Sequence, residues 1–141
     1  MSFSSETRQL FDFMGDSLFS ELQPGEAASV QLNGEEQTYL RFTDSKLRQA
    51  TQVWQRNLTL NLQYLGRKVT CSFDLSGDQN ADLQTLLTLL RHARKETQSL
   101  PEDPYLVPFQ NHGNSEQNHT GALPDAGQVI NCITHATEGT G

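Results

Sequence analysis

Hydrophobic and polar residues alternate with a period of two in the middle of this chain, from Tyr39 to Asp74. Leucines alternate with polar residues over 58–63, and apolar residues alternate with Thr, Ser and Asp over 69–74. Successive side chains of a strand point to opposite faces, so each run has one apolar and one polar face. A sheet with one solvated face is usually antiparallel. The pattern therefore predicts an antiparallel scaffold whose apolar face is covered by other elements.

Turn signals divide residues 28–74 into four or five strands. The expected strands span residues 28–32, 35–42, 46–53, 56–64 and 68–74. Asn33-Gly34 is a tight-turn signal, and Thr43-Asp44-Ser45 is a run of residues whose side chains bond to local backbone. Trp54 marks either a bend between two strands or the middle of one long strand, and the sequence leaves both open.

Amphipathic helices are expected on both sides of the strands. The first runs from about Ser5 to Leu22, is capped by Ser4 or Ser5, and is ended by Pro24-Gly25. Its apolar stripe consists of Leu10, Met14, Leu18 and Leu22, with Phe11 and Phe19 beside it. The second helix, 78–97, is rich in leucine and follows a capping-box pattern from Ser76 to Gln79. We expect an α+β fold with both helices packed on one face of the sheet. A partner-binding role for the first stripe is the alternative.

The remainder of the chain has a different composition. Residues 101–122 are rich in Pro, Asn, Gln and Gly, which predicts a flexible linker after a first domain of residues 1–100. Residues 123–141 contain an amphipathic helix with Val129, Ile130 and Ile133 on its stripe. This isolated helix is interpreted as the start of a following domain, and docking on the sheet domain is the alternative.

Composition limits the classes of partner. The net charge of −7 and the pI of about 4.9 argue against a nucleic-acid surface and against an anionic membrane surface. No apolar run is long enough to span a membrane, and the N-terminus does not resemble a signal peptide. Cys71 and Cys132 are the two cysteines, and a disulfide framework is not expected, which favours a cytoplasmic location.

Catalytic motifs are absent from the sequence. It contains no His-Glu-x-x-His and no glycine-rich phosphate loop after a strand. The histidines His112, His119 and His135, with Cys132 and Glu116, match no closed zinc pattern. Cys71 is expected to be a small buried hydrophobic residue. We therefore assign no catalytic, cofactor-binding or metal-binding residue.

A basic cluster lies near the end of the second helix. It consists of Arg91, His92, Arg94 and Lys95. The favoured interpretation is that these cations complement the negative end of the helix, and a phosphate site is the alternative.

Two arginines near the Thr43-Asp44-Ser45 turn are candidates for an interface. Arg41 and Arg48 lie on strands expected to pair, where a charge must be solvated or paired. One interpretation is an ion pair with an acidic neighbour, and the other is an anchor for another domain or subunit. Val129, Ile130 and Ile133 complete the set of possible interface residues.

The segment from Tyr39 to Ala50, with the sequence YLRFTDSKLRQA, is similar to the strand–turn–strand near the start of TldD/PmbA proteins. These proteins are described as metallopeptidases and as modulators of DNA gyrase. Leu100–Leu106 after the leucine-rich helix and Leu123-Pro124-Asp125 before the closing helix resemble one branch of that family. The resemblance covers most of the chain from about Glu26 onward, and its motifs are structural.

The resemblance implies the N-terminal domain of a longer cytoplasmic bacterial protein, followed by a larger β-rich domain. Family members form homodimers or heterodimers, and active members bind zinc through His-Glu-x-x-x-His, whose glutamate is the general base. That motif is absent here, so the resemblance assigns no metal or catalytic residue to this sequence. Zinc is then expected only in the remainder of the protein or in its partner, and partner subunits of this family can lack the motif.

Two functional hypotheses follow. The first is a non-catalytic domain of a TldD/PmbA-like peptidase, or of its motif-lacking partner subunit, in contact with the remainder of its chain and a dimer partner. The second is a free-standing α+β interaction module without enzymatic activity. A gyrase-associated adaptor is a weaker third possibility, because the acidic charge disfavours direct contact with DNA.

Overall fold

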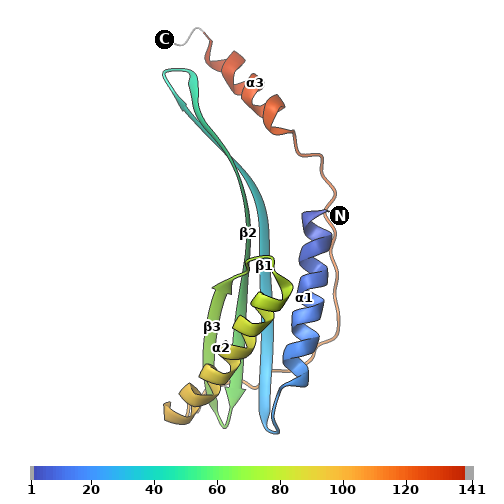
Figure 1. Cartoon of the computed structure of the whole chain (residues 1–141), viewed down its shortest axis with the longest axis vertical. Coiled ribbons are helices and arrows are strands. Elements are labelled where there is room, and N and C mark those ends of the chain that lie inside the picture. Colours follow the sequence, from blue (N-terminus) through green and yellow to red (C-terminus); the bar gives the residue numbers. More distant parts are fainter. Residues whose placement is uncertain (1, 139–141) are drawn as a thin grey trace. The chain divides into compact units, whose positions relative to one another are not determined.

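The computed structural model describes residues 2–138 and confirms the α+β class (Figure 1). The elements in chain order are α1 (Phe3–Ser20), β1 (Glu26–Thr43), β2 (Lys46–Tyr64), β3 (Arg67–Asp74), α2 (Gln79–Ser99) and α3 (Ala126–Thr137). The chain forms two compact units. The first comprises the residues up to Glu35 together with Gln55–Asn111, and the second comprises Glu36–Trp54 together with the residues from His112 onward.

The described residues form one sheet of three strands in the order β1-β2-β3, so the prediction of four to five strands is wrong. The predicted strands 28–32 and 35–42 are joined in β1, and 46–53 and 56–64 are joined in β2. Trp54 accordingly lies inside one long strand. β2 and β3 are antiparallel, with a register that runs from Asn57 opposite Asp74 to Tyr64 opposite Arg67.

Gly34 explains why the Asn33-Gly34 signal was misleading. It lies within β1, and a β-carbon at this position would come within 3.2 Å of the Thr7 methyl group and 3.5 Å of the Phe3 ring. The glycine therefore permits α1 to approach the strand closely, as glycine in a strand often does. The true turn lies at Asp44-Ser45, where both residues have positive φ (51° and 58°), as a two-residue hairpin turn requires.

The core lies between the two long helices and one face of β2 and β3. Register places Leu58, Leu60 and Leu62 of β2 opposite Phe73, Cys71 and Val69 of β3, so all six share a face. The helix residues buried with them are Leu10, Met14 and Leu18 of α1 and Leu86, Leu90 and Ala93 of α2. α2 packs on both β3 and α1. The α1 stripe is therefore core, although Phe19 at its edge is exposed.

Side-chain oxygens cap α1 and α2 two or more residues away from the predicted positions. Ser2 rather than Ser4 or Ser5 caps α1, accepting the Ser5 N–H at 3.3 Å. Asp78 rather than Ser76 caps α2. Its side chain accepts from the backbone N–H groups of Asn80 and Ala81. The carboxylate of Asp82, which is buried, accepts the N–H and hydroxyl of Ser76 at 2.8 Å each. Asp82, a residue of α2, thus fixes the loop that precedes the helix.

Residues 100–109 return to the sheet after α2. The buried side chain of Gln63 donates to the Val107 carbonyl at 3.0 Å and accepts the Phe109 N–H at 3.1 Å. The Arg67 guanidinium donates to the Leu100 carbonyl at 2.7 Å. Because Gln63 follows Leu62 in the strand, this contact lies on the face opposite the core. The predicted flexible linker 101–122 therefore begins with residues bonded to the sheet, and its flexibility stays a prediction.

A capping box starts α3 in the second unit. Asp125 accepts the N–H of Gln128 at 2.9 Å, and the Gln128 side chain accepts the Asp125 N–H at 3.1 Å. Val129, Ile130 and Ile133 are half-buried on this helix. Within residues 2–138, no helix combines the length and apolar character required to cross a membrane.

We expect Leu60→Ala to lower the free energy of unfolding by about 3 kcal/mol, because Leu60 is fully buried at the centre of the core. Urea denaturation followed by circular dichroism measures this loss. Leu65→Ala is the matched control: Leu65 is 64% exposed, so its loss should stay below about 0.5 kcal/mol. Equal losses for the two variants would contradict the described core.

Gln63→Ala should release residues 107–109 from the sheet. We expect faster hydrogen exchange at the Phe109 amide and a loss of about 1–2 kcal/mol in unfolding free energy, because the two hydrogen bonds that attach the segment to the sheet are lost. Gln31→Ala is the control, since Gln31 is exposed and bonds only the nearby Asn33 side chain. Unchanged exchange at Phe109 would contradict the contact.

Candidate functional site

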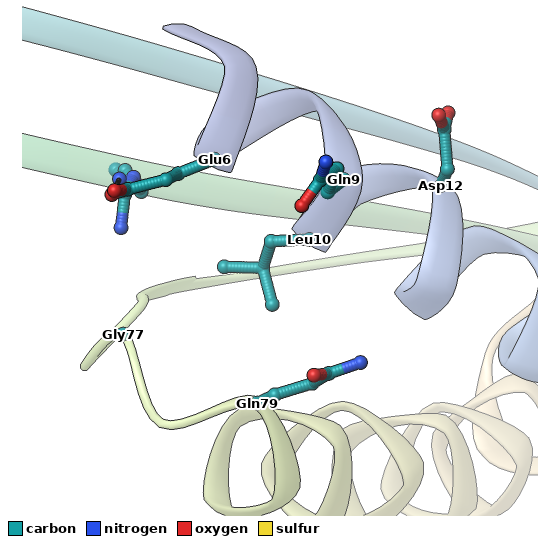
Figure 2. A pocket seen from close by; sticks show the side chains of 7 residues that line it. Glu6, Gln9, Leu10, Asp12, Gly77 and Gln79 are labelled. Atoms are coloured by element: carbon teal, nitrogen blue, oxygen red, sulfur yellow. Dashed lines mark hydrogen bonds and ion pairs between the residues drawn. The ribbon is translucent and has the colours of Figure 1, made fainter. Parts of the chain in front are cut away.

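Two clefts in the first unit are the candidates for a ligand site. One has a volume of about 470 Å³ and lies between the N-terminal half of α1 and the start of α2. Figure 2 shows Glu6, Gln9 and Asp12 on α1, Gln79 at the start of α2, and Leu10 between the two helices. The remaining lining residues are Arg56 and Gly77.

Arg56 has a structural role at this first cleft. Its Nε donates to the Thr7 hydroxyl at 2.8 Å, and its Nη2 lies 3.3 Å from a carboxylate oxygen of Glu6. The guanidinium also lies 4.4 Å from the centroid of the Phe3 ring, a cation–π distance. These contacts fix the start of α1 against β2. The described lining residues contain no serine, cysteine, histidine or lysine, and their ionisable side chains are the carboxylates of Glu6 and Asp12 and the guanidinium of Arg56.

We call the second cleft, of about 460 Å³, the basic cleft. It lies between the C-terminal half of α2, the end of β2 and the start of β1. Its lining residues are Gln23, Glu26, Tyr64, Arg91, Arg94, Lys95, Thr97 and Gln98. Three of them are cations and one is a carboxylate, in a protein whose net charge is −7.

The carboxylate of Glu26 is neutralised by Arg94. The Arg94 Nε and Nη2 donate to the two Glu26 carboxylate oxygens at 2.7 and 2.9 Å, and Nη2 also donates to the Glu21 carbonyl at 2.6 Å. The Glu26 side chain is only 4% exposed. The bond with Arg94 lowers the pKa of Glu26 against the opposing effect of burial, and the same bond raises the pKa of Arg94. This bidentate pair joins α2 to the start of β1.

Arg91 and Lys95 are the cations of the basic cleft that no carboxylate neutralises within the described range 2–138. Arg91 donates from Nη2 to the Thr88 hydroxyl at 2.8 Å. The interpretation that the basic cluster complements the end of the helix is wrong, because α2 continues to Ser99 and its last turn has no basic residue. His92, the fourth member of the cluster, does not line this cleft.

The structure places the predicted interface arginines near the hairpin turn in the second unit. The two-residue turn at Asp44-Ser45 is expected to bring Arg41 and Arg48 opposite each other. Both are exposed, and neither takes part in an ion pair in the part of the chain that the structure describes. The proposed acidic neighbour is therefore not found there, and the interface interpretation stays a prediction. Val129, Ile130 and Ile133 lie on α3 in the same unit.

The histidine and cysteine candidates are not brought together. Across residues 2–138, no group of three or more His, Cys, Asp or Glu side chains has the spacing to hold a metal ion. His135 instead lies 3.4 Å from Glu138. Burial, with a smaller effect of the Glu96 charge, raises the pKa of Cys71, and its half-buried side chain packs against the core. A thiol with a raised pKa is a poor nucleophile.

Comparison with protein families, with curated proteins and with solved structures gives no match to this chain. Any functional assignment therefore depends on the geometry of the clefts and on the sequence resemblance described above.

Sequence reasoning missed the Glu26–Arg94 pair. Glu26 and Arg94 are 68 residues apart, and no local pattern links them. Only the return of α2 onto the sheet brings Arg94 to Glu26.

We expect Arg94→Gln to lower the unfolding free energy at pH 7 by about 3 kcal/mol, because a buried carboxylate is left without its partner. Glu26 has a lowered pKa when folded, so the stabilisation is present above its unfolded value near 4.5 and is lost as pH falls through the folded value. The difference between wild type and variant in urea denaturation should therefore shrink below pH 4.5.

Arg91→Gln is the matched control, because Arg91 bonds no carboxylate in the described structure and is exposed. The unfolding free energy of this variant should equal that of the wild type at pH 7 and below pH 4.5. A loss for Arg94→Gln that does not depend on pH would show that the charge of Glu26 is not the cause.

Proposed function

We propose that this chain is the non-catalytic N-terminal domain of a TldD/PmbA-like zinc peptidase, or of the partner subunit that lacks the motif. In this proposal the domain contributes to assembly with the remainder of its chain and with a homodimer or heterodimer partner. Zinc and the general base belong to those other parts. The absence of His-Glu-x-x-x-His from the sequence is consistent with this division of roles.

The observation that carries the proposal is the far end of the β1–β2 hairpin, residues 36–54, which we call the arm. The arm belongs to the second unit, and β3 pairs only with residues 57–64 of β2. A two-stranded hairpin is at best marginally stable in water without a third strand or a covering element. The arm is therefore suited to a surface that another domain or subunit covers.

The side chains of the arm support this proposal. Tyr39 and Trp54 are 51% and 55% exposed, and Leu47 is also exposed. Tyrosine, tryptophan and arginine are the residue types most often found at energetically important interface positions. The arm combines the first two with Arg41 and Arg48, whose guanidinium groups are available for a carboxylate of a partner.

A photo-crosslinking amino acid at position 54, in the protein expressed in its own cells, tests this assembly role. We expect it to capture a protein that carries His-Glu-x-x-x-His, or a second member of the same family, identified by mass spectrometry. The same amino acid at position 84 is the control, because Gln84 is exposed on α2. It should not capture that protein.

Two results would contradict the proposal. Capture at position 54 of proteins without any relation to this family would favour the free-standing interaction module. Cleavage of unfolded peptides by the purified chain itself, sensitive to a chelator, would overturn the assignment of a non-catalytic domain.

A further inference from the structure

We propose that the basic cleft binds a small phosphate ester, with its phosphate held by Arg91 and Lys95 and its organic part facing Tyr64. This inference is independent of the proposed function, because it concerns the first unit alone and requires no partner subunit.

Uncompensated charge is the first argument. The lining of the basic cleft contains Arg91, Arg94 and Lys95 but one carboxylate, Glu26, which is buried and bound to Arg94. Arg91 and Lys95 are four residues apart on α2, so they lie on the same face, where like charges repel. An anion between them would remove this repulsion. The overall charge of −7 means that this local excess is not a general property of the surface.

The second argument is that the surroundings of the two cations are fixed before any ligand arrives. Arg94 is held by Glu26 and by the Glu21 carbonyl, and the buried Thr97 hydroxyl donates to the Arg94 carbonyl at 2.8 Å. The Thr88 hydroxyl accepts from one nitrogen of Arg91, which leaves other guanidinium N–H groups to donate. The ordered part of the lining is therefore Arg94 and its partners, and a lining that is already ordered costs less entropy on binding than a mobile one.

Tyr64 forms the apolar part of the lining, and its ring lies close to Gly25. Gly25 has a positive φ of 86°, and a β-carbon there would lie 3.3 Å from the Tyr64 ring. A side chain at residue 25 would therefore crowd the ring and would have to adopt a positive φ, which glycine does without strain. The side-chain amides of Gln23 and Gln98 complete the polar lining.

Charge and size together select the class of ligand. A phosphate monoester has three terminal oxygens that accept hydrogen bonds, and it carries nearly two negative charges. It therefore matches one guanidinium and one ammonium group better than a carboxylate with a single charge does. The cleft volume of about 460 Å³ is within the range of small-molecule sites and leaves space for an organic group beside the phosphate. Two free cations are too few for a nucleic-acid surface, which requires an extended basic patch.

The test uses phenyl phosphate as the probe, titrated into the isotope-labelled full chain at low ionic strength and followed by amide chemical shifts. We expect saturable shifts at Gly25, Arg91 and Lys95, and weaker binding as salt is added. Phenol, benzoate and inorganic phosphate are titrated in parallel, and each should bind at least tenfold more weakly than phenyl phosphate.

The double variant Arg91→Gln, Lys95→Gln should weaken phenyl phosphate binding at least tenfold. Both residues are exposed, so the variant should keep the wild-type urea midpoint, which shows that it is folded. Lys68→Gln is the control for loss of a positive charge outside the cleft, because Lys68 is exposed and is paired with Gln63 on the face of the sheet opposite the core. It should bind as the wild type does.

Several results would overturn the proposal. Unchanged affinity in the folded double variant would show that the two cations do not hold the phosphate. If inorganic phosphate binds as tightly as phenyl phosphate, the organic part has no role in binding. If benzoate binds as tightly as phenyl phosphate, the cleft has no preference for phosphate. Absence of saturable shifts with phenyl phosphate would reject the site itself.

Discussion

Burial of one face of β2 is the constraint on which the first unit depends. Leu58, Leu60 and Leu62 are all fully buried, and the buried residues of α1, α2 and β3 pack with them in one cluster. Because strand side chains alternate, the same backbone must present Thr59, Asn61 and Gln63 on the other face. That face is organised by hydrogen bonds instead, between Thr59 and Ser72 and between Asn61 and Thr70.

The same alternation shows why the fold class was predictable while the strand count was not. Period-two patterning over 58–63 and 69–74 predicted strands there and an antiparallel sheet with one apolar face, and helical spacing of apolar residues predicted the two covering helices. Asn33-Gly34 has the local chemistry of a turn, but the packing of Phe3 and Thr7 against Gly34 gives that glycine another role. Turn propensity is a local signal, and here a contact with a distant helix outweighs it.

The candidate site was less accessible to sequence reasoning than the fold. The basic residues of α2 were visible, and their position near the end of a helix favoured an electrostatic role at the helix terminus. One local fact and one long-range fact changed that interpretation. The helix extends to Ser99, and the Glu26 carboxylate, 68 residues before Arg94, binds one of the cations and leaves the others without a carboxylate partner.

The contact between Gln63 and residues 107–109 has a consequence for how this segment can evolve. The Gln63 amide has the same donor and acceptor as a peptide group, and it bonds only main-chain atoms, the Val107 carbonyl and the Phe109 N–H. Pro108, between them, is not required to donate. Val107 is 73% exposed, so its side chain contributes little to the attachment. The anchor therefore recognises an extended backbone and not a particular sequence, so position 107 is free to vary while Gln63 is not.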